Sequence, residues 1–131
     1  MEKKVSDISI VIAGAAGQGV QTVEELLVGI LKMSGYNIFA TKEYESRVRG
    51  GSNSTEIRVS SNRVTTFVNR IDILIPLNSA AFSHVKPRLS EHSIIITDPS
   101  LVEGIQNLKE EQIISFPFTK IASEVGSKIY A

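Results

Sequence analysis

Three short apolar runs rich in β-branched residues constrain the fold of this chain more than any other feature. They are "DISIVIAG" (residues 7–14), "IDILIPL" (residues 71–77) and "HSIIITD" (residues 92–98). Continuous apolar runs of this length are typical of strands that are buried on both faces of a parallel sheet. Such strands need helices on both sides of the sheet. The sequence therefore predicts an α/β domain.

The segment after the first run predicts a helix over residues 19–34. Its apolar residues recur at helical spacing, and Gly35 follows as a stop signal. "YNIFAT" (residues 36–41) is a second predicted strand, so residues 8–41 form a β-α-β unit. Farther along, the pattern predicts a helix over 78–90, with Asn78 as its cap and Pro87 near its end. A weak helix over 101–111 and a strand over 112–118 are predicted next. The last predicted element is an amphipathic helix over 119–131, with Ile121, Val125 and Ile129 on one side.

A β-hairpin is predicted to interrupt this alternation of strands and helices. "STEIRVS" (residues 54–60) alternates in polarity, and "RVTTFV" (residues 63–68) follows it across Ser61 and Asn62. The predicted fold is a three-layer, Rossmann-like α/β domain over residues 1–131, with a mixed, mostly parallel sheet and a β-hairpin insertion.

Composition narrows the class of protein. The 131 residues carry a formal net charge of zero, which gives no sign of a nucleic-acid partner. The chain contains no cysteine, so it cannot supply thiolates to a zinc ion or an iron-sulfur cluster. The first apolar run, of about six residues, is too short for a signal peptide or a membrane span. We therefore expect a cytoplasmic protein without a membrane partner.

The loop "GAAGQG" (residues 14–19) is the first candidate site. It lies between a strand and a helix N-terminus, where unpaired N–H groups favour a phosphate or carboxylate. Gly14 and Gly19 match the dinucleotide fingerprint G-x-G-x-x-G, but Ala16 replaces its second glycine. Glu43 or Glu45 is the candidate ribose ligand in that interpretation. The alternative is a tight turn without a nucleotide.

The loop "YESRVRGG" (residues 44–51) is the second candidate. Two adjacent glycines permit close approach of the backbone to another group, and Arg47 and Arg49 place fixed positive charge beside them. A solvated loop and a contact with a partner or ligand are both compatible with this pattern.

No catalytic constellation is predicted. Ser46, Ser52 or Ser54 together with His84 or His92 would supply a nucleophile and a base, but the chain has no G-x-S-x-G elbow and neither histidine has an evident orienting group. Asp72 and Asp98 stand at strand ends, where capping of a helix or turn explains them. No metal site is predicted in this chain.

Taken together, these motifs resemble the gamma subunit or gamma domain of the 2-oxoacid:ferredoxin (2-oxoacid:acceptor) oxidoreductases. That family's pattern is G-x-G-G-Q-G, a helix, G-Y, a strand, and Y-x-S-x-x-R-G-G. The chain departs from it at Ala16. It matches at Gly14, Gly17, Gln18, Gly19, Gly35, Tyr36, Tyr44, Ser46, Arg49, Gly50 and Gly51.

The resemblance implies a non-catalytic part of an oxidoreductase that acts on the oxo group of its donor. In the family, a 2-oxoacid is oxidatively decarboxylated on thiamine diphosphate with Mg, electrons pass through iron-sulfur clusters to ferredoxin, and the acyl group goes to coenzyme A. The implied partners are alpha and beta thiamine-binding subunits and ferredoxin-like subunits or domains. This chain itself is expected to hold no cofactor firmly and to serve in assembly or to face coenzyme A. The matching residues, excluding Gly35 and Tyr36, are the candidate contacts.

Two further expectations concern length and function. The family's gamma domains extend beyond the stretch matched here, so the carboxyl-terminal part of the domain is expected to be missing, and an exposed apolar face could then cause dimerisation. The alternatives in other functional classes are a free-standing Rossmann-type nucleotide-binding domain and a purely structural assembly module.

Overall fold

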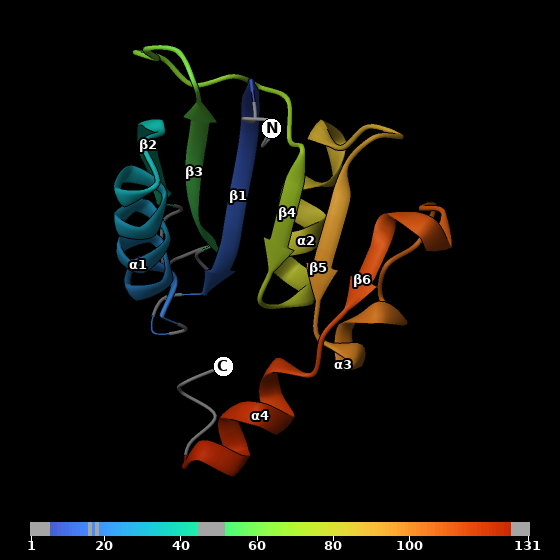
Figure 1. The fold of residues 1–131 in the computed structure, drawn as a ribbon. Coiled ribbons are helices and arrows are strands. Elements are labelled where there is room, and N and C mark those ends of the chain that lie inside the picture. Colours follow the sequence, from blue (N-terminus) through green and yellow to red (C-terminus); the bar gives the residue numbers. More distant parts are fainter. Residues whose placement is uncertain (1–5, 16, 18, 45–51, 127–131) are drawn as a thin grey trace.

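The computed structural model describes residues 6–15, 17, 19–44 and 52–126 of the chain. Six strands in these residues form one mixed sheet in the spatial order β2-β3-β1-β4-β5-β6 (Figure 1). All run in the same direction except β3, which is antiparallel to both of its neighbours. The strands are β1 (Asp7–Ala15), β2 (Asn37–Tyr44), β3 (Ser52–Ser60), β4 (Ile73–Pro76), β5 (Ile94–Thr97) and β6 (Ile113–Ser115).

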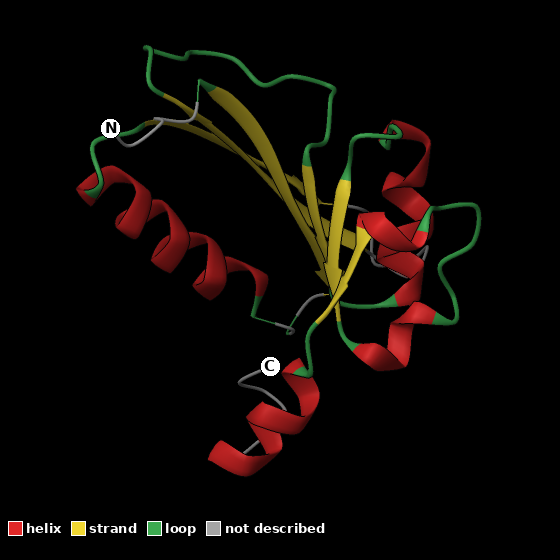
Figure 2. Cartoon of the chain, turned by 45° about the vertical axis from the view of Figure 1, so that its right-hand side comes forward, coloured by secondary structure: helices red, strands yellow, loops and turns green. Residues whose placement is uncertain are grey.

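Helices on both faces of the sheet give the three layers that the sequence predicts (Figure 2). The helix α1 (Val20–Met33) packs on one face against β1, β2 and β3. The helix α2 (Ser79–Val85) packs on the other face and leads into a 3-10 turn at Lys86–Arg88. The remaining helical elements are α3 (Pro99–Val102), a 3-10 turn at Glu110–Gln112, and α4 (Phe118–Val125). In the part of the chain that the structure describes, no helix has the length and apolarity needed to cross a membrane.

The sequence signals at the helix ends are confirmed. Asn78 caps α2, because its side-chain oxygen accepts a hydrogen bond from the backbone N–H of Ala81 at 2.7 Å. Pro87 lies in the 3-10 turn that ends this helix. The helix α1 ends at Met33, and Gly35 follows with a φ of 88°, a conformation that favours glycine.

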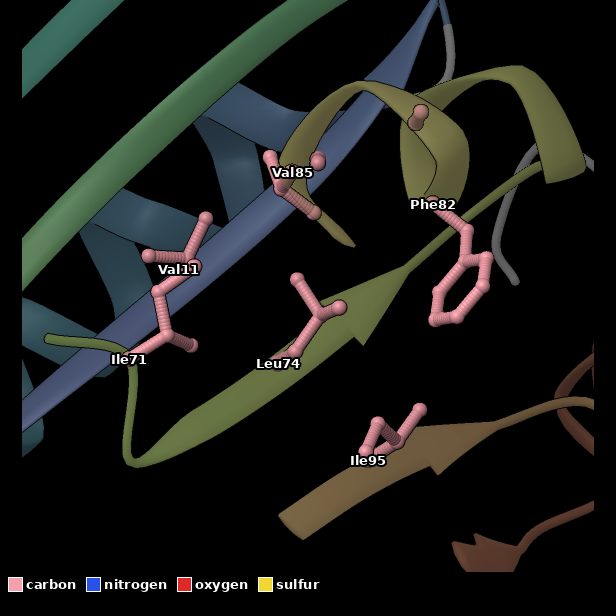
Figure 3. Packing of buried hydrophobic residues seen from close by; sticks show 8 residues of the cluster. Val11, Ile71, Leu74, Phe82, Val85 and Ile95 are labelled. Atoms are coloured by element: carbon pink, nitrogen blue, oxygen red, sulfur yellow. The ribbon is translucent and has the colours of Figure 1, made fainter. Parts of the chain in front are cut away.

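Each face of the sheet carries its own apolar core, because alternate residues of a strand point to opposite sides. The core on the α2 side is built around Val11, Ile71, Leu74, Phe82, Val85 and Ile95 (Figure 3). The core on the α1 side is built around Ile12, Val20, Ile57 and Val59. Burying one such side chain contributes roughly 1.5–3 kcal/mol, so the two clusters fix the register of the central strands.

The predicted partner of the third strand is wrong. Residues 63–68 form no strand, and β3 pairs instead with β2 on one side and β1 on the other. The reason lies in the directions of the strands. Because β3 runs opposite to β1 whereas β4 runs parallel to it, β3 ends where β4 begins, at the amino end of β1. Residues 61–72 therefore only need to cross that end of the sheet. The antiparallel hairpin is formed by β2 and β3.

Two predicted helices are shorter than expected. The weak helix over 101–111 is reduced to α3, because Gly104 follows it and Asn107 has a φ of 64°, outside the helical region. The last helix, α4, ends at Val125, where Gly126 follows with a φ of 151°. Ile121 and Val125 are exposed on it, and Ile129 lies outside the described residues.

A cluster of charged side chains connects β1, β3 and β4 at the end of the sheet where β1 and β4 begin and β3 ends. Arg58 donates two hydrogen bonds to the carboxylate of Asp7, at 3.0 and 3.1 Å. The hydrogen bonds from Arg58 lower the pKa of Asp7. Asp72 accepts from Arg70 and from the backbone N–H of Ser9 at 2.9 Å. The role predicted for Asp72 is thus local: it binds backbone and a neighbouring arginine at a strand end.

Asp98 links the segment after β5 to the start of α4. One carboxylate oxygen accepts from the backbone N–H of Ser100 at 3.0 Å and from its hydroxyl at 2.7 Å, which caps α3 as predicted. The other accepts from the backbone N–H of Thr119 at 2.8 Å. Partial burial alone would raise the pKa of Asp98, but these hydrogen bonds to Thr119 and Ser100 lower it to about 2.

We predict that Asp98→Asn makes the chain less stable at neutral pH, by about 1 kcal/mol, because the charge that strengthens three hydrogen bonds is lost. The pKa of Asp98 is lower in the folded state than in the unfolded chain. The stabilisation is therefore complete above pH 4 and disappears as the pH falls toward 2. Urea unfolding of both proteins between pH 2 and 7 measures this, with Glu103→Gln on the exposed end of the same helix as control. A gap between wild type and Asp98→Asn that is the same at every pH would contradict the assignment.

Candidate functional site

The candidate site lies at the carboxyl end of β1, where the connections from two neighbouring strands leave toward opposite faces of the sheet. β1 leads to α1 on one face of the sheet, and its parallel neighbour β4 leads to α2 on the opposite face (Figures 1 and 2). In open α/β sheets, ligands bind in the crevice outside the carboxyl ends of two such strands. The loop from Gly14 to Gly19 starts at this crevice.

The glycines of this loop are required by backbone conformation. Gly17 has a φ of 86° and Gly19, which caps α1, a φ of 80°. A Cβ atom built on either would meet no atom of the described residues within 4 Å, so closeness to those residues does not explain the two glycines. Gly14 differs, because it lies buried in β1 opposite Asn53 of β3. Ala16 and Gln18 lie outside the described residues.

A pocket of about 260 Å³ opens beside these glycines. One wall is the loop and the first turn of α1, and the other is formed by the end of β2 and the start of β3. Its lining residues are Ala15, Gly17, Gly19, Val20, Gln21, Lys42, Asn53, Ser54 and Thr55. The described lining thus combines a helix N-terminus with the basic side chain of Lys42.

Lys42 is held in this wall by a buried carboxylate. Its Nζ lies 3.1 Å from Oε2 of Glu24, whose side chain is only 9% exposed. The hydroxyl of Thr55 donates to the same oxygen at 3.5 Å. Glu24 comes from the second turn of α1, Lys42 from β2 and Thr55 from β3, so the three side chains join the elements that surround the pocket.

The charges and dipoles of the pocket suit an anionic group. The first N–H groups of α1 point out of the helix, and the helix dipole places partial positive charge there. No side chain of the described residues caps this N-terminus. Lys42 adds an ammonium group with three donors to the same pocket. A phosphate or a carboxylate is the ligand group that this arrangement would bind.

Sequence reasoning missed Glu24 and Lys42 as members of the site. The sequence does contain an indication for Glu24. By helical spacing, Glu24 shares the inner face of α1 with Val20, Leu27 and Leu31, so that a carboxylate stands in an otherwise apolar stripe. Its burial requires a partner. Lys42 follows Ile38 by four residues on β2 and therefore shares the face of the sheet that α1 covers.

The second candidate loop starts and ends beside the first. Tyr44 at the end of β2 pairs with Asn53, which pairs on its other side with Gly14 of β1. Ser52 pairs with Ala15. The two strand ends that residues 45–51 join therefore adjoin the glycine loop. Tyr44 is described only in its backbone, and Ser46, Arg47, Arg49, Gly50 and Gly51 lie outside the described residues.

Glu43, the candidate ribose ligand, is on the wrong side of the sheet for the glycine loop. It pairs with Ser54, which pairs with Ala13, a member of the core on the α2 side. There it lines a second pocket, of about 390 Å³, together with Arg88 and Glu56. The other candidate, Glu45, is outside the described residues.

The second pocket contains a partly buried ion pair. Nη1 of Arg88 donates to Oε1 of Glu56, and Nε of Arg88 donates to the carbonyl of Asn69 at 3.1 Å. Oε2 of Glu56 and Nη2 of Arg88 are buried without a hydrogen-bond partner among the described residues. This pair connects β3 to the turn after α2 on the face opposite the glycine loop.

The serine and histidine candidates are not brought together. Ser54 is buried in β3, His84 is exposed on α2, and the His92 side chain is 86% exposed in the turn before β5. Among the residues that the structure describes, no group of three or more histidines and carboxylates is placed to hold a metal ion. Ser46 lies outside those residues, and the side chain of Ser52 is not described.

Comparisons with known proteins agree with the fold and the motifs. The model of the family described as pyruvate ferredoxin/flavodoxin oxidoreductase matches residues 9–131. A 2-oxoglutarate synthase subunit, KorC, of Archaeoglobus fulgidus is 30% identical over 127 residues, which cover 95% of this chain and 65% of that subunit. The chain thus spans about two thirds of the length of this curated relative.

Two solved structures share the fold. The 2-oxoglutarate:ferredoxin oxidoreductase from Magnetococcus marinus, with 2-oxoglutarate, coenzyme A and succinyl-CoA bound, superposes with a TM-score of 0.77 at 18% identity, over 96% of this chain and 22% of that one. The gamma subunit of a keto/oxoacid ferredoxin oxidoreductase from Geobacter sulfurreducens gives 0.66 at 24% identity, over 93% of this chain and 69% of that one. The resemblance seen in the glycine and arginine motifs is therefore confirmed: the chain belongs to the pyruvate ferredoxin/flavodoxin oxidoreductase family, in which it corresponds to the gamma subunit or gamma domain.

Proposed function

We propose that this chain is the gamma part of a thiamine diphosphate-dependent 2-oxoacid:ferredoxin oxidoreductase. In this role it supports the oxidative decarboxylation of a 2-oxoacid, with transfer of electrons to ferredoxin. Family membership supports the proposal, as does the Archaeoglobus relative, which is a 2-oxoglutarate synthase subunit. The partners are alpha and beta thiamine-binding subunits or domains and a cluster-bearing, ferredoxin-like unit.

The chain contributes position and binding rather than the reacting groups. It contains no cysteine, so the thiolates that hold iron-sulfur clusters come from its partners. The structure brings no serine and histidine together in the described residues, and we assign the thiamine diphosphate and its Mg to the alpha and beta units. When bound there, thiamine diphosphate supplies the carbanion chemistry of the decarboxylation.

The more specific part of the proposal is that this chain faces coenzyme A, and the pocket at the glycine loop supports it. Coenzyme A presents a pyrophosphate and a further phosphate, and the pocket offers a helix N-terminus with Lys42 beside it. The strand ends that flank the Arg49 loop adjoin the same pocket. In this assignment, Gly17 and Gly19 leave the backbone N–H groups accessible, and Glu24 holds Lys42 at the pocket wall.

The sheet order argues against a free-standing dinucleotide-binding domain. In that fold, β2 lies directly beside β1, and an acid at its end reaches the ribose of a nucleotide held by the glycine loop. Here β3 separates the two strands, and Glu43 projects to the opposite face. Among the described residues, no acid at the end of β2 therefore lies where a NAD held by the glycine loop would need it.

We predict that coenzyme A raises the midpoint of thermal unfolding of the purified chain and that NAD does not. A ligand at a hundred times its Kd adds roughly 2.7 kcal/mol to the free energy of unfolding, which is easily measured. Lys42→Met should reduce the shift with coenzyme A, whereas Lys120→Met on the exposed face of α4 should not. A shift with NAD alone would revive the nucleotide-binding alternative. No shift with coenzyme A, ADP or NAD would leave assembly as the only role.

We predict that Arg49→Ala weakens either the assembly of the complex or its affinity for coenzyme A. Charge-assisted hydrogen bonds are roughly twice as strong as neutral ones, so a loss of several-fold in affinity is expected from removing one. The matched control is Arg63→Ala, which removes an exposed arginine from the segment between β3 and β4. If both quantities stay at the wild-type values, the loop is structural and the assignment of Arg49 is wrong.

We predict that the purified chain alone does not oxidise 2-oxoacids and gains this activity only with its thiamine-binding and cluster-bearing partners. The assay is the reduction of ferredoxin or viologen with pyruvate, 2-oxoglutarate or branched-chain 2-oxoacids, with and without the partner subunits. Reduction by the chain alone would overturn the proposed division of roles.

A further inference from the structure

The outer edge of β2 is unpaired in the part of the chain that the structure describes. β2 stands at one side of the sheet and pairs only with β3 (Figure 1). The backbone N–H and C=O groups on its other side therefore have no strand partner among the described residues. An edge of this kind is a template for pairing with a further strand.

This edge lacks most of the features by which proteins protect exposed strands. Those features are short length, bulges, proline and charged side chains. β2 has eight residues, and its pairing with β3 continues without a bulge from Asn37↔Ser60 to Tyr44↔Asn53. Its middle, residues 38–41, reads Ile-Phe-Ala-Thr, without proline or charge. The edge can therefore accept another strand.

Ala40 leaves space at the middle of this edge. It pairs with Ile57, a core residue on the α1 side, so its side chain faces that side of the sheet. It is nevertheless exposed, whereas Ile38 on the same face is half-buried. The helix α1 thus leaves the edge open at Ale40's position, and the small side chain lets a second backbone approach.

The sequence of β2 is self-complementary about Ala40. Two copies of β2 can pair in antiparallel directions with Ala40 opposite Ala40. The opposed pairs are then Ala40–Ala40, Phe39–Thr41, Ile38–Lys42 and Asn37–Glu43. An aromatic residue opposite a β-branched one stabilises antiparallel strands, whereas like charges opposite each other destabilise them. In this register no like charges are opposed.

The exposed charges of α1 lie on the flank that faces this edge. Glu24 contacts Lys42 of β2, so its side of the helix is turned toward β2. Glu25 and Lys32 lie farther round the same flank, by about 80–100°, because residues of a helix are about 100° apart. Both are exposed. A second copy paired with β2 would therefore bring its own α1 opposite this flank.

These charges fit the same axis as the strand does. The helix α1 runs from the carboxyl end of β1 to the start of β2 and is thus antiparallel to β2. From Lys42 to Ala40 the strand covers about 6.6 Å, the rise of about four residues of helix. Since Glu24 lies at the level of Lys42, the level of Ala40 falls roughly at residues 28–29 of α1. Glu25 and Lys32 are equally far from that level on its two sides.

A twofold axis at Ala40 therefore sets Glu25 of each copy opposite Lys32 of the other. Other registers lose this match. An axis at Thr41 would bring the two Glu25 side chains close together, and an axis at Phe39 would do the same for the two Lys32 side chains. Charge complementarity thus favours the axis at Ala40.

We propose that the outer edge of β2 is the docking site of a second copy of this chain, with the two β2 strands antiparallel about a twofold axis at Ala40. The interface is isologous, so that each copy contributes the same residues. Pairing would satisfy the outer backbone groups of β2 and continue the sheet through both copies. This inference does not depend on coenzyme A binding, so either can fail without the other.

The first test places charges on the axis and measures self-association of the purified chain by sedimentation. Ala40→Lys and Ala40→Glu each set two like charges opposite one another and should lower the association constant roughly tenfold or more. An equimolar mixture of the two variants should associate at least as strongly as the wild type. Ser34→Lys and Ser34→Glu, at the exposed end of α1 away from the axis, are the matched controls and should not change association.

The second test exchanges the charges of α1 and keeps Ala40. Glu25→Lys and Lys32→Glu should each weaken association, and the double variant should restore it, because the opposite charges then face each other again. Restoration distinguishes a contact across the axis from a local effect on the helix, which the double variant would not repair. Thermal unfolding of each variant shows that the chain remains folded.

Three outcomes would overturn the proposal. One is a wild-type chain that stays monomeric at every concentration reached. Another is a dimer whose association constant is the same in the Ala40 variants as in the wild type. The third is a monomeric chain whose Ala40 variants assemble less well with the thiamine-binding subunits, because the strand that occupies the edge would then belong to another subunit.

Discussion

The rest of the structure depends on the insertion of one antiparallel strand, β3, between two parallel ones. β3 pairs with β1 from Asp7↔Ser60 to Ala15↔Ser52 and with β2 from Asn37↔Ser60 to Tyr44↔Asn53. Because each strand adds about 4.8 Å of width, this insertion moves β2 one strand farther from β1. It also brings the start of β3 and the end of β2 to the glycine loop. The pocket beside the glycine loop is therefore lined by the ends of two further strands, at Lys42 of β2 and Asn53 of β3, which a conventional β-α-β unit would not bring there.

The two faces of β3 carry side chains of different chemistry. Thr55 projects toward α1 and contacts the buried Glu24, whereas the next residue, Glu56, projects to the other face and pairs with Arg88. A shift of β3 by one residue would exchange these side chains and place Glu56 in the α1-side core. The apolar neighbours Ile57 and Val59, buried against α1, therefore fix the register on which both pockets depend.

The sequence was sufficient to predict what depends on local chemistry. The apolar runs, the Asn78 cap, the stop at Gly35 and the strand-to-helix turn at Gly19 each have a physical cause within a few residues. It was not sufficient for long-range pairing: the alternation in residues 54–60 indicates a strand but does not say which strand lies beside it. The partnership of Glu24 and Lys42 is missed for the same reason, because its two residues are joined only when β2 is placed over the inner face of α1. The predicted helix over 101–111 is too long, because the residues that interrupt it, Gly104 and Asn107, lie inside the predicted range.

The ion pair of the buried Glu24 with the partly exposed Lys42 is not explained by stability. Removing the Glu24 carboxylate from water costs free energy that its attraction to a partly exposed ammonium group repays only with good geometry, and apolar residues of similar size are often at least as stable in such buried positions. An apolar residue at position 24 would continue the stripe formed by Val20, Leu27 and Leu31, so packing alone would favour it. The carboxylate is accordingly best understood by what it does to Lys42. It holds a flexible, strongly hydrated ammonium group at one point beside the N-terminus of α1, and so reduces the side-chain entropy that binding an anion would otherwise cost. In the proposed function, a phosphate bound there would meet an ammonium group that is already held in position.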